Sequence, residues 1–139
     1  MENKIKETEN GIVVTPDQAS IEVVASYVEE TLEKSEVAMR DSYKINIALD
    51  ELYSNIVRYS GASEAKVRCV VDEHTVTLHL QDNGVPYDPT AKEDADMEQL
   101  AEEDQIGGRG IFLVKKLMSK MTYCYENGYN ELTVKLQRM

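Results

Sequence analysis

A glutamate and an asparagine four residues apart are the first indication of chemistry in this sequence. Glu51 and Asn55 lie in a segment with helical periodicity, so their side chains project from one face, about 40° apart. Asparagine is unfavourable inside a helix, because its side chain competes with the backbone for hydrogen bonds. A surface stripe with polar edges would explain the pair. The functional interpretation is an Mg²⁺ ligand (Asn55) beside a proton-accepting carboxylate (Glu51).

A second candidate segment is Asp82-Asn83-Gly84, which ends an alternating apolar run. A carboxylate at the edge of a sheet can accept a hydrogen bond from the exocyclic amine of adenine. Glycine there lets the backbone approach a flat base closely. The same residue types also favour plain turns, so the segment predicts either a base-binding edge or a simple turn.

A third candidate is the cluster Gly107-Gly108-Arg109-Gly110, which opens a segment of helical periodicity. Glycines before a helix N-terminus expose backbone N–H groups, and each such terminus favours an anion by roughly 0.3–1 kcal/mol at exposed sites. Arg109 could add a charged donor. The cluster therefore predicts a phosphate site, with a flexible hinge as the alternative.

Three segments with helical spacing must position these residues. The first helix is expected from Thr15, as N-cap, and Pro16 to about residue 35. The second is expected from about Asp41 to Gly61, and it carries the glutamate and asparagine pair. The third follows the glycine cluster.

Alternating apolar and polar residues predict the strands. One or two short strands are expected within residues 5–14, followed by two longer strands at 65–71 and 75–82. Residues 121–126 and 129–137 read as a hairpin, because Asn127-Gly128 is a strong turn signal. Cys69 and Cys124 fall in strand-like runs and are expected to be buried, reduced thiols.

Length and charge restrict the function classes. The 139 residues suit a single domain, 1–139, and the net charge of −11 argues against nonspecific binding to nucleic acid or anionic membranes. No apolar run approaches the roughly 20 residues that span a bilayer. The polar N-terminus has no signal-peptide core, so a cytoplasmic location is expected. Residues 90–106 hold seven acids and one lysine, and such long loops are often functional.

The order and spacing of the three candidate segments are more specific than any one of them. "ALDELYSNIVRYS" resembles the N-box of the GHKL ATPase superfamily, "DNGVPYDP" its first glycine box, and "IGGRGIFLVKKLM" its second. The resemblance covers roughly residues 15–137. It implies the Bergerat ATP-binding fold, an α/β two-layer sandwich with a mixed, mostly antiparallel sheet and about three helices on one face.

Within that superfamily the chain is most similar to short anti-sigma factor serine kinases. By this resemblance Glu51 orients or deprotonates the attacking hydroxyl, Asn55 holds Mg²⁺, Asp82 reads the adenine amine and residues 90–106 form the ATP lid. The residues implied to bind nucleotide are Asn55, Asp82, Gly84, Gly107, Gly108, Arg109, Gly110 and Thr133. The alternation of the last strand turns Thr133 outward unless a bulge changes its parity.

The resemblance implies ATP and Mg²⁺ as cofactors and a role in bacterial partner switching. The chain is expected to bind a sigma factor or to phosphorylate a STAS-domain anti-anti-sigma factor. One alternative is a non-catalytic ATP-binding module that sequesters a protein partner, and another is an α/β domain without nucleotide. An uncovered sheet face could support a homodimer.

Overall fold

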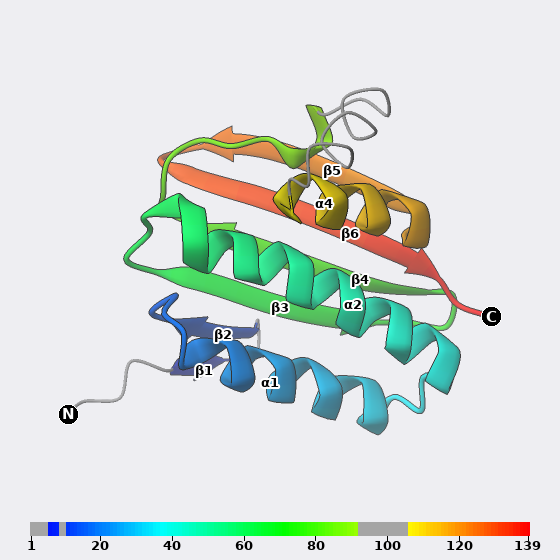
Figure 1. The fold of residues 1–139 in the computed structure, drawn as a ribbon. Helices are drawn as coiled ribbons and strands as arrows, with labels where there is room; N and C mark the ends of the chain where they lie inside the picture. Colours follow the sequence, from blue (N-terminus) through cyan, green and yellow to red (C-terminus); the bar gives the residue numbers. More distant parts are fainter. Residues whose placement is uncertain (1–5, 9–10, 92–105) are drawn as a thin grey trace.

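A computed structural model describes residues 6–8, 11–91 and 106–139 of the chain. Its strands form one sheet in the order β1-β2-β3-β4-β6-β5, and the helices pack side by side on one face of it (Figure 1). The strands are β1 (Lys6–Thr8), β2 (Gly11–Val14), β3 (Ala65–Val71), β4 (Thr75–Asp82), β5 (Lys120–Glu126) and β6 (Tyr129–Gln137). The helical elements are α1 (Ser20–Lys34), α2 (Met39–Asn55), the π-helix η1 (Ile56–Ser60), the 3₁₀ helix η2 (Pro89–Ala91) and α4 (Ile106–Leu117).

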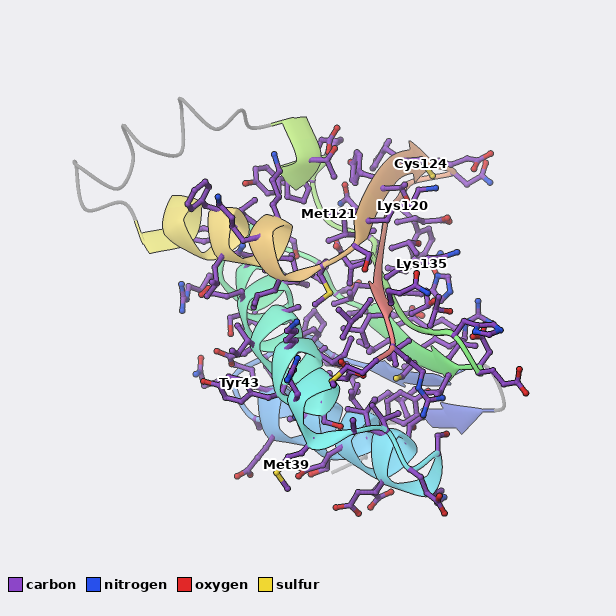
Figure 2. All side chains as sticks on the ribbon, turned by 90° about the vertical axis from the view of Figure 1, so that its right-hand side faces the viewer. Met39, Tyr43, Lys120, Met121, Cys124 and Lys135 are labelled. Carbon is purple, nitrogen blue, oxygen red and sulfur yellow. The ribbon has the colours of Figure 1, made fainter. Side chains whose placement is uncertain are left out.

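The expected two-layer α/β sandwich is confirmed. Every described strand pairing is antiparallel, so the part of the sheet that the structure describes contains no parallel pair. A view turned by 90° shows the helices on one side of the sheet and no described helix over the other (Figure 2). None of the helices described within residues 11–91 and 106–139 is long and apolar enough to cross a membrane.

Strand alternation decides which side chains face the helices. Pairing runs without a break from Ala65↔Asp82 across β3 and β4, and from Asp82↔Asn130 across β4 and β6. The fully buried Val67, Leu78 and Val134 therefore share the helix-facing side of the sheet. The side chains of Asp82 and Asn130 point to this same side of the sheet, so two polar side chains lie at the end of the apolar face.

The start of α1 differs from the prediction. The helix begins at Ser20 instead of Pro16, and the carboxylate of Asp17 accepts a hydrogen bond from the Ser20 amide at 3.0 Å just before it. The Asp17 amide in turn donates to the Thr15 carbonyl oxygen at 2.8 Å, which makes a turn of the predicted first residues. The capping role predicted for Thr15 was therefore wrong.

The end of the second helix is confirmed, with one unexpected feature. Gly61 adopts a left-handed conformation (φ 67°) and ends the helix, as its lack of a Cβ allows. The last five residues before it, however, form the π-helix η1. Such segments occur frequently at functional sites. Ser20 and Tyr53 form a buried hydroxyl–hydroxyl hydrogen bond of 2.6 Å that joins α1 to α2.

The C-terminal hairpin is confirmed. Asn127 and Gly128 both have positive φ (56° and 83°), and the pairing starts at Glu126↔Tyr129.

Only one of the two cysteines is buried as predicted. Cys69 is 7% exposed, and burial raises the pKa of its thiol to about 12. Cys124, labelled in Figure 2, is exposed because β5 is the edge strand of the sheet.

Candidate functional site

The carboxylate of Glu51 lies against the backbone of Gly110. A Cβ at Gly110 would overlap that carboxylate, so a larger residue there would displace the end of the Glu51 side chain. The half-buried Glu51 has a raised pKa, first because burial disfavours its charged form and second because Asp50 repels it. The nearby Arg58 acts in the opposite direction and lowers that pKa. The second glycine segment thus meets the predicted catalytic acid.

Asn55 is the last residue of α2, one turn beyond Glu51, at the point where the π-helix begins. Its side chain is partly exposed, and it makes no hydrogen bond to any other residue that the structure describes. The amide oxygen in this position can therefore accept a hydrogen bond from a bound molecule or coordinate a metal ion.

The π-helix brings the first glycine segment to the same end of α2. The Ser60 carbonyl oxygen accepts a hydrogen bond of 2.9 Å from the Val85 amide. A Cβ at Gly84 would overlap the Ser60 carbonyl group, so glycine is required at this crossing as well. Segments that are distant in the sequence therefore converge around residues 51–60.

Asp82 is 5% exposed, and one of its carboxylate oxygens has no hydrogen-bond partner within the described part of the chain. Its Oδ1 accepts hydrogen bonds from the Gly84 amide at 2.8 Å and from Asn130 Nδ2 at 3.1 Å. Its Oδ2 accepts none from the described residues. Among these residues no fully buried polar side-chain atom is left unpaired, so Oδ2 retains some contact with solvent. The open oxygen can accept a hydrogen bond from a ligand.

Sequence reasoning missed Asn130, which lies directly opposite Asp82 in the sheet and is 6% exposed. A signal was present, since Asn130 shares the parity of Leu132, Val134 and Leu136, which are all buried. A polar residue at a core-facing position needs buried partners. The alternation of buried and exposed positions along this strand could therefore have identified Asn130 from the sequence.

Thr133 is not brought into this site. The unbroken register of β4 and β6 turns it to the uncovered face, where its hydroxyl is 3.2 Å from Nδ1 of His79. There it lines a pocket together with Lys66, Arg68, His79, Gln81 and Glu131, across the sheet from Asp82. The implied contact of Thr133 with adenine is therefore contradicted by strand parity.

The glycine cluster lies inside α4 instead of before it. Ile106 is the first helical residue, so Gly107, Gly108 and Arg109 belong to the first turn of the helix. Backbone N–H groups of a first turn lack helical partners, which is what anion binding requires. The Arg109 side chain is not among those described. Residues 92–105 of the predicted ATP lid also lie outside the described residues.

Comparison with known proteins agrees with these motifs. The model of the histidine kinase-like ATPase domain family matches residues 14–136. The serine/threonine-protein kinase BtrW of Bordetella bronchiseptica is 28% identical over 108 residues, which cover 70% of this chain and 76% of BtrW. The serine-protein kinase RsbW of Listeria monocytogenes is 28% identical over 99 residues, or 66% of this chain and 63% of RsbW. The chain thus spans less than two thirds of the RsbW relatives.

Two solved structures share the fold. Histidine kinase AdeS of Acinetobacter baumannii aligns with a TM-score of 0.52 and 19% identity, covering 87% of this chain and 64% of that one. A chain of the SiaB-SiaC complex from Pseudomonas aeruginosa aligns with a TM-score of 0.55 and 15% identity, covering 97% and 91%. The family match spans all three motif segments, which confirms the GHKL resemblance: this chain belongs to the histidine kinase-like ATPase domain family.

Proposed function

We propose that this chain is an ATP-dependent serine kinase and anti-sigma factor of a bacterial partner-switching pathway. It phosphorylates a serine of a STAS-domain anti-anti-sigma partner, binds a sigma factor, or does both, in the cytoplasm. The observation that carries the proposal is the position of the Glu51 carboxylate against Gly110, one helical turn from Asn55. The kinase names of BtrW and RsbW support it. A homodimer through the uncovered sheet face remains a prediction.

The adenine end of the proposed site is Asp82 with Gly84. The open Oδ2 of Asp82 would accept a hydrogen bond from the exocyclic amine, since an ionised carboxylate only accepts. Gly84 packs against Ser60, and its amide donates to Asp82 Oδ1, so it would help to hold the carboxylate toward a base. Both residues fit a base that carries an amine donor.

The phosphate end would be the first turn of α4, with the backbone N–H group of Gly108 as a donor. Gly110 is the fifth helical residue, so its N–H group faces the Ile106 carbonyl and does not fit the donor role that the resemblance implies. The described residues include no cluster of three or more His, Cys, Asp or Glu side chains that could hold a metal ion. A single protein ligand such as Asn55 is compatible with Mg²⁺, because magnesium usually takes one or two protein ligands and completes its shell with phosphate and water. Bound Mg²⁺ would neutralise charge on the phosphates.

Glu51 is assigned the role of orienting the attacking serine hydroxyl and accepting its proton. Its raised pKa makes it a better proton acceptor than an ordinary surface carboxylate. Its half-buried position beside Gly110 places that acceptor next to the proposed phosphate end. Most of the catalysis would come from positioning and charge neutralisation.

Two measurements test the proposal. Calorimetry with ATP and Mg²⁺ should show binding that Asn55→Ala weakens by about tenfold or more. Radiolabelled ATP should then label a STAS-domain protein from the same genome, with Glu51→Gln slower and Glu33→Gln, an exposed glutamate on α1, unchanged.

The outcomes separate the alternatives. Absence of ATP binding at millimolar concentration would overturn the nucleotide site. ATP binding without transfer to any STAS protein would favour the non-catalytic module that sequesters a partner. Full transfer by Glu51→Gln would remove the proton-accepting role from Glu51 while leaving the kinase assignment in place.

A further inference from the structure

Asn130 is the centre of a hydrogen-bond network that holds both Asp82 and the loop after β4. Its Nδ2 donates to Asp82 Oδ1 at 3.1 Å and to the Val85 carbonyl oxygen at 2.9 Å. Its Oδ1 accepts from the Tyr87 amide at 3.0 Å and from the Tyr123 hydroxyl. Two donors and two acceptor positions are all that an asparagine side chain offers, and all four are used.

The backbone partners define the orientation of this amide. The Tyr87 N–H can only donate and the Val85 C=O can only accept, so Oδ1 must face Tyr87 and Nδ2 must face Val85. The second N–H of Asn130 therefore points at Asp82 by necessity. A flipped amide would place an oxygen against the Asp82 carboxylate.

This network acts on only one of the two Asp82 oxygens. With the Gly84 amide and Asn130 both on Oδ1, the carboxylate is held so that Oδ2 is the open acceptor. The same side chain anchors Val85 and Tyr87 of the loop that follows Gly84. Asn130 thus couples the direction of Oδ2 to the position of the base-binding loop.

We propose that Asn130 is a positioning residue that gives the site its preference for a purine bearing a 6-amino group. It acts through Asp82, by orienting Oδ2 toward that amine, and this role rests on the proposed ATP binding. Inosine triphosphate has a carbonyl in place of the amine and a proton on the adjacent N1, while its ribose and triphosphate are those of ATP. It therefore separates base reading from general binding.

The experiment is calorimetry of ATP and inosine triphosphate, each with Mg²⁺, on the full chain. Wild type should prefer ATP by roughly ten- to a hundredfold, the value of a hydrogen bond to a charged group. Asn130→Ala should reduce this preference by about fivefold or more. Loss of the bonds to Val85 and Tyr87 should weaken both nucleotides, but ATP should lose more affinity than inosine triphosphate. Tyr123→Phe removes only the bond to Oδ1 and should reduce the preference by about two- to fivefold.

Thr133→Val, on the same strand but the opposite face, is the matched control and should change neither affinity. Equal weakening of both nucleotides by Asn130→Ala would overturn the proposal, because a purely structural role has that result. If Asn130→Ala does not fold, Tyr123→Phe decides, and an unchanged preference there overturns it. A wild type that binds both nucleotides equally refutes base reading but not ATP binding, whereas binding of neither refutes the proposed function itself.

Discussion

Glu51 and Gly110 are in contact across two helices, and the contact exists because residue 110 has no side chain. The three atoms nearest to a Cβ at this position all belong to the Glu51 carboxyl group. The Glu51 carboxylate on α2 therefore lies directly against the first part of α4. The proposed catalytic and phosphate-binding groups depend on this single approach.

Gly110→Ala and Gly84→Ala are expected to fail in different ways. The Cβ at 110 meets the end of a flexible side chain, so stability should change by less than about 1 kcal/mol while Glu51 is displaced. Phosphoryl transfer should then fall by about tenfold or more. The Cβ at 84 meets the Ser60 backbone, which cannot move aside cheaply, and should cost about 1–3 kcal/mol.

Urea unfolding combined with single-turnover transfer checks this contrast. A Gly110→Ala protein with normal stability and normal transfer would show that the position of Glu51 does not matter for the reaction. An undiminished free energy of unfolding for Gly84→Ala would show that the loop can move away from Ser60.

The pH dependence of transfer should follow the neighbours of Glu51. A proton acceptor works in its ionised form, so activity should be lost as pH falls through the raised pKa of Glu51. Arg58→Ala removes a stabilising positive charge and should move this acidic limb to higher pH. Asp50→Asn removes a repelling charge and should move it to lower pH. Profiles of kcat for both variants test the prediction, and parallel shifts in one direction would contradict it.

Stability should show the same titration with the corresponding sign. The pKa of Glu51 is raised in the folded state, so that state binds more protons than the unfolded chain between the ordinary value of 4.5 and the raised value. The titration of Glu51 should therefore lower the free energy of unfolding as pH rises through this window. Glu51→Gln should remove that decrease, measured by denaturant unfolding at several pH values. An identical pH dependence in both proteins would exclude it.

Asp82→Asn and Thr133→Val test the two faces of the sheet. Asp82→Asn replaces a buried acceptor-only group and should abolish detectable ATP binding or weaken it by about tenfold or more. Thr133→Val should leave ATP binding unchanged, because its hydroxyl meets His79 on the other face. Calorimetry on both variants gives the answer. A loss of ATP affinity in Thr133→Val would mean that nucleotide reaches the uncovered face.

The two thiols should differ in reactivity. Cys124 is exposed and should react with a disulfide reagent in the native protein. The reaction should be slowed because local desolvation by neighbouring atoms, and then Glu131, raise the pKa of its thiol. Cys69, with a pKa of about 12 and little exposure, should react only after unfolding. Thiol counting in native and denaturing buffer distinguishes them, with Cys69→Ala as the control. Two fast thiols in native buffer would contradict the buried position of Cys69.

Local signals in the sequence were sufficient for several elements. The hairpin of β5 and β6 follows from period-two alternation around Asn127-Gly128, since both turn residues tolerate positive φ. Gly61 ends the second helix because a left-handed residue costs glycine no steric strain. The three motif segments likewise indicated the family before any contact between them was known. The hairpin and the helix end depend on neighbours within a few residues, whereas the family depends on the order of three short segments along the chain.

Only the tertiary structure determined which side chains meet. The contact of Glu51 with Gly110, the crossing of Gly84 and Ser60, and the pairing of Asn130 with Asp82 all join segments far apart in the chain. Helix packing and strand order bring them together, and no local pattern encodes either. The orientation of Thr133 toward the uncovered face has the same origin. The unbroken pairing of β6 with β4 decides which side of the sheet every residue of β6 faces, and a sequence motif cannot change this for one residue.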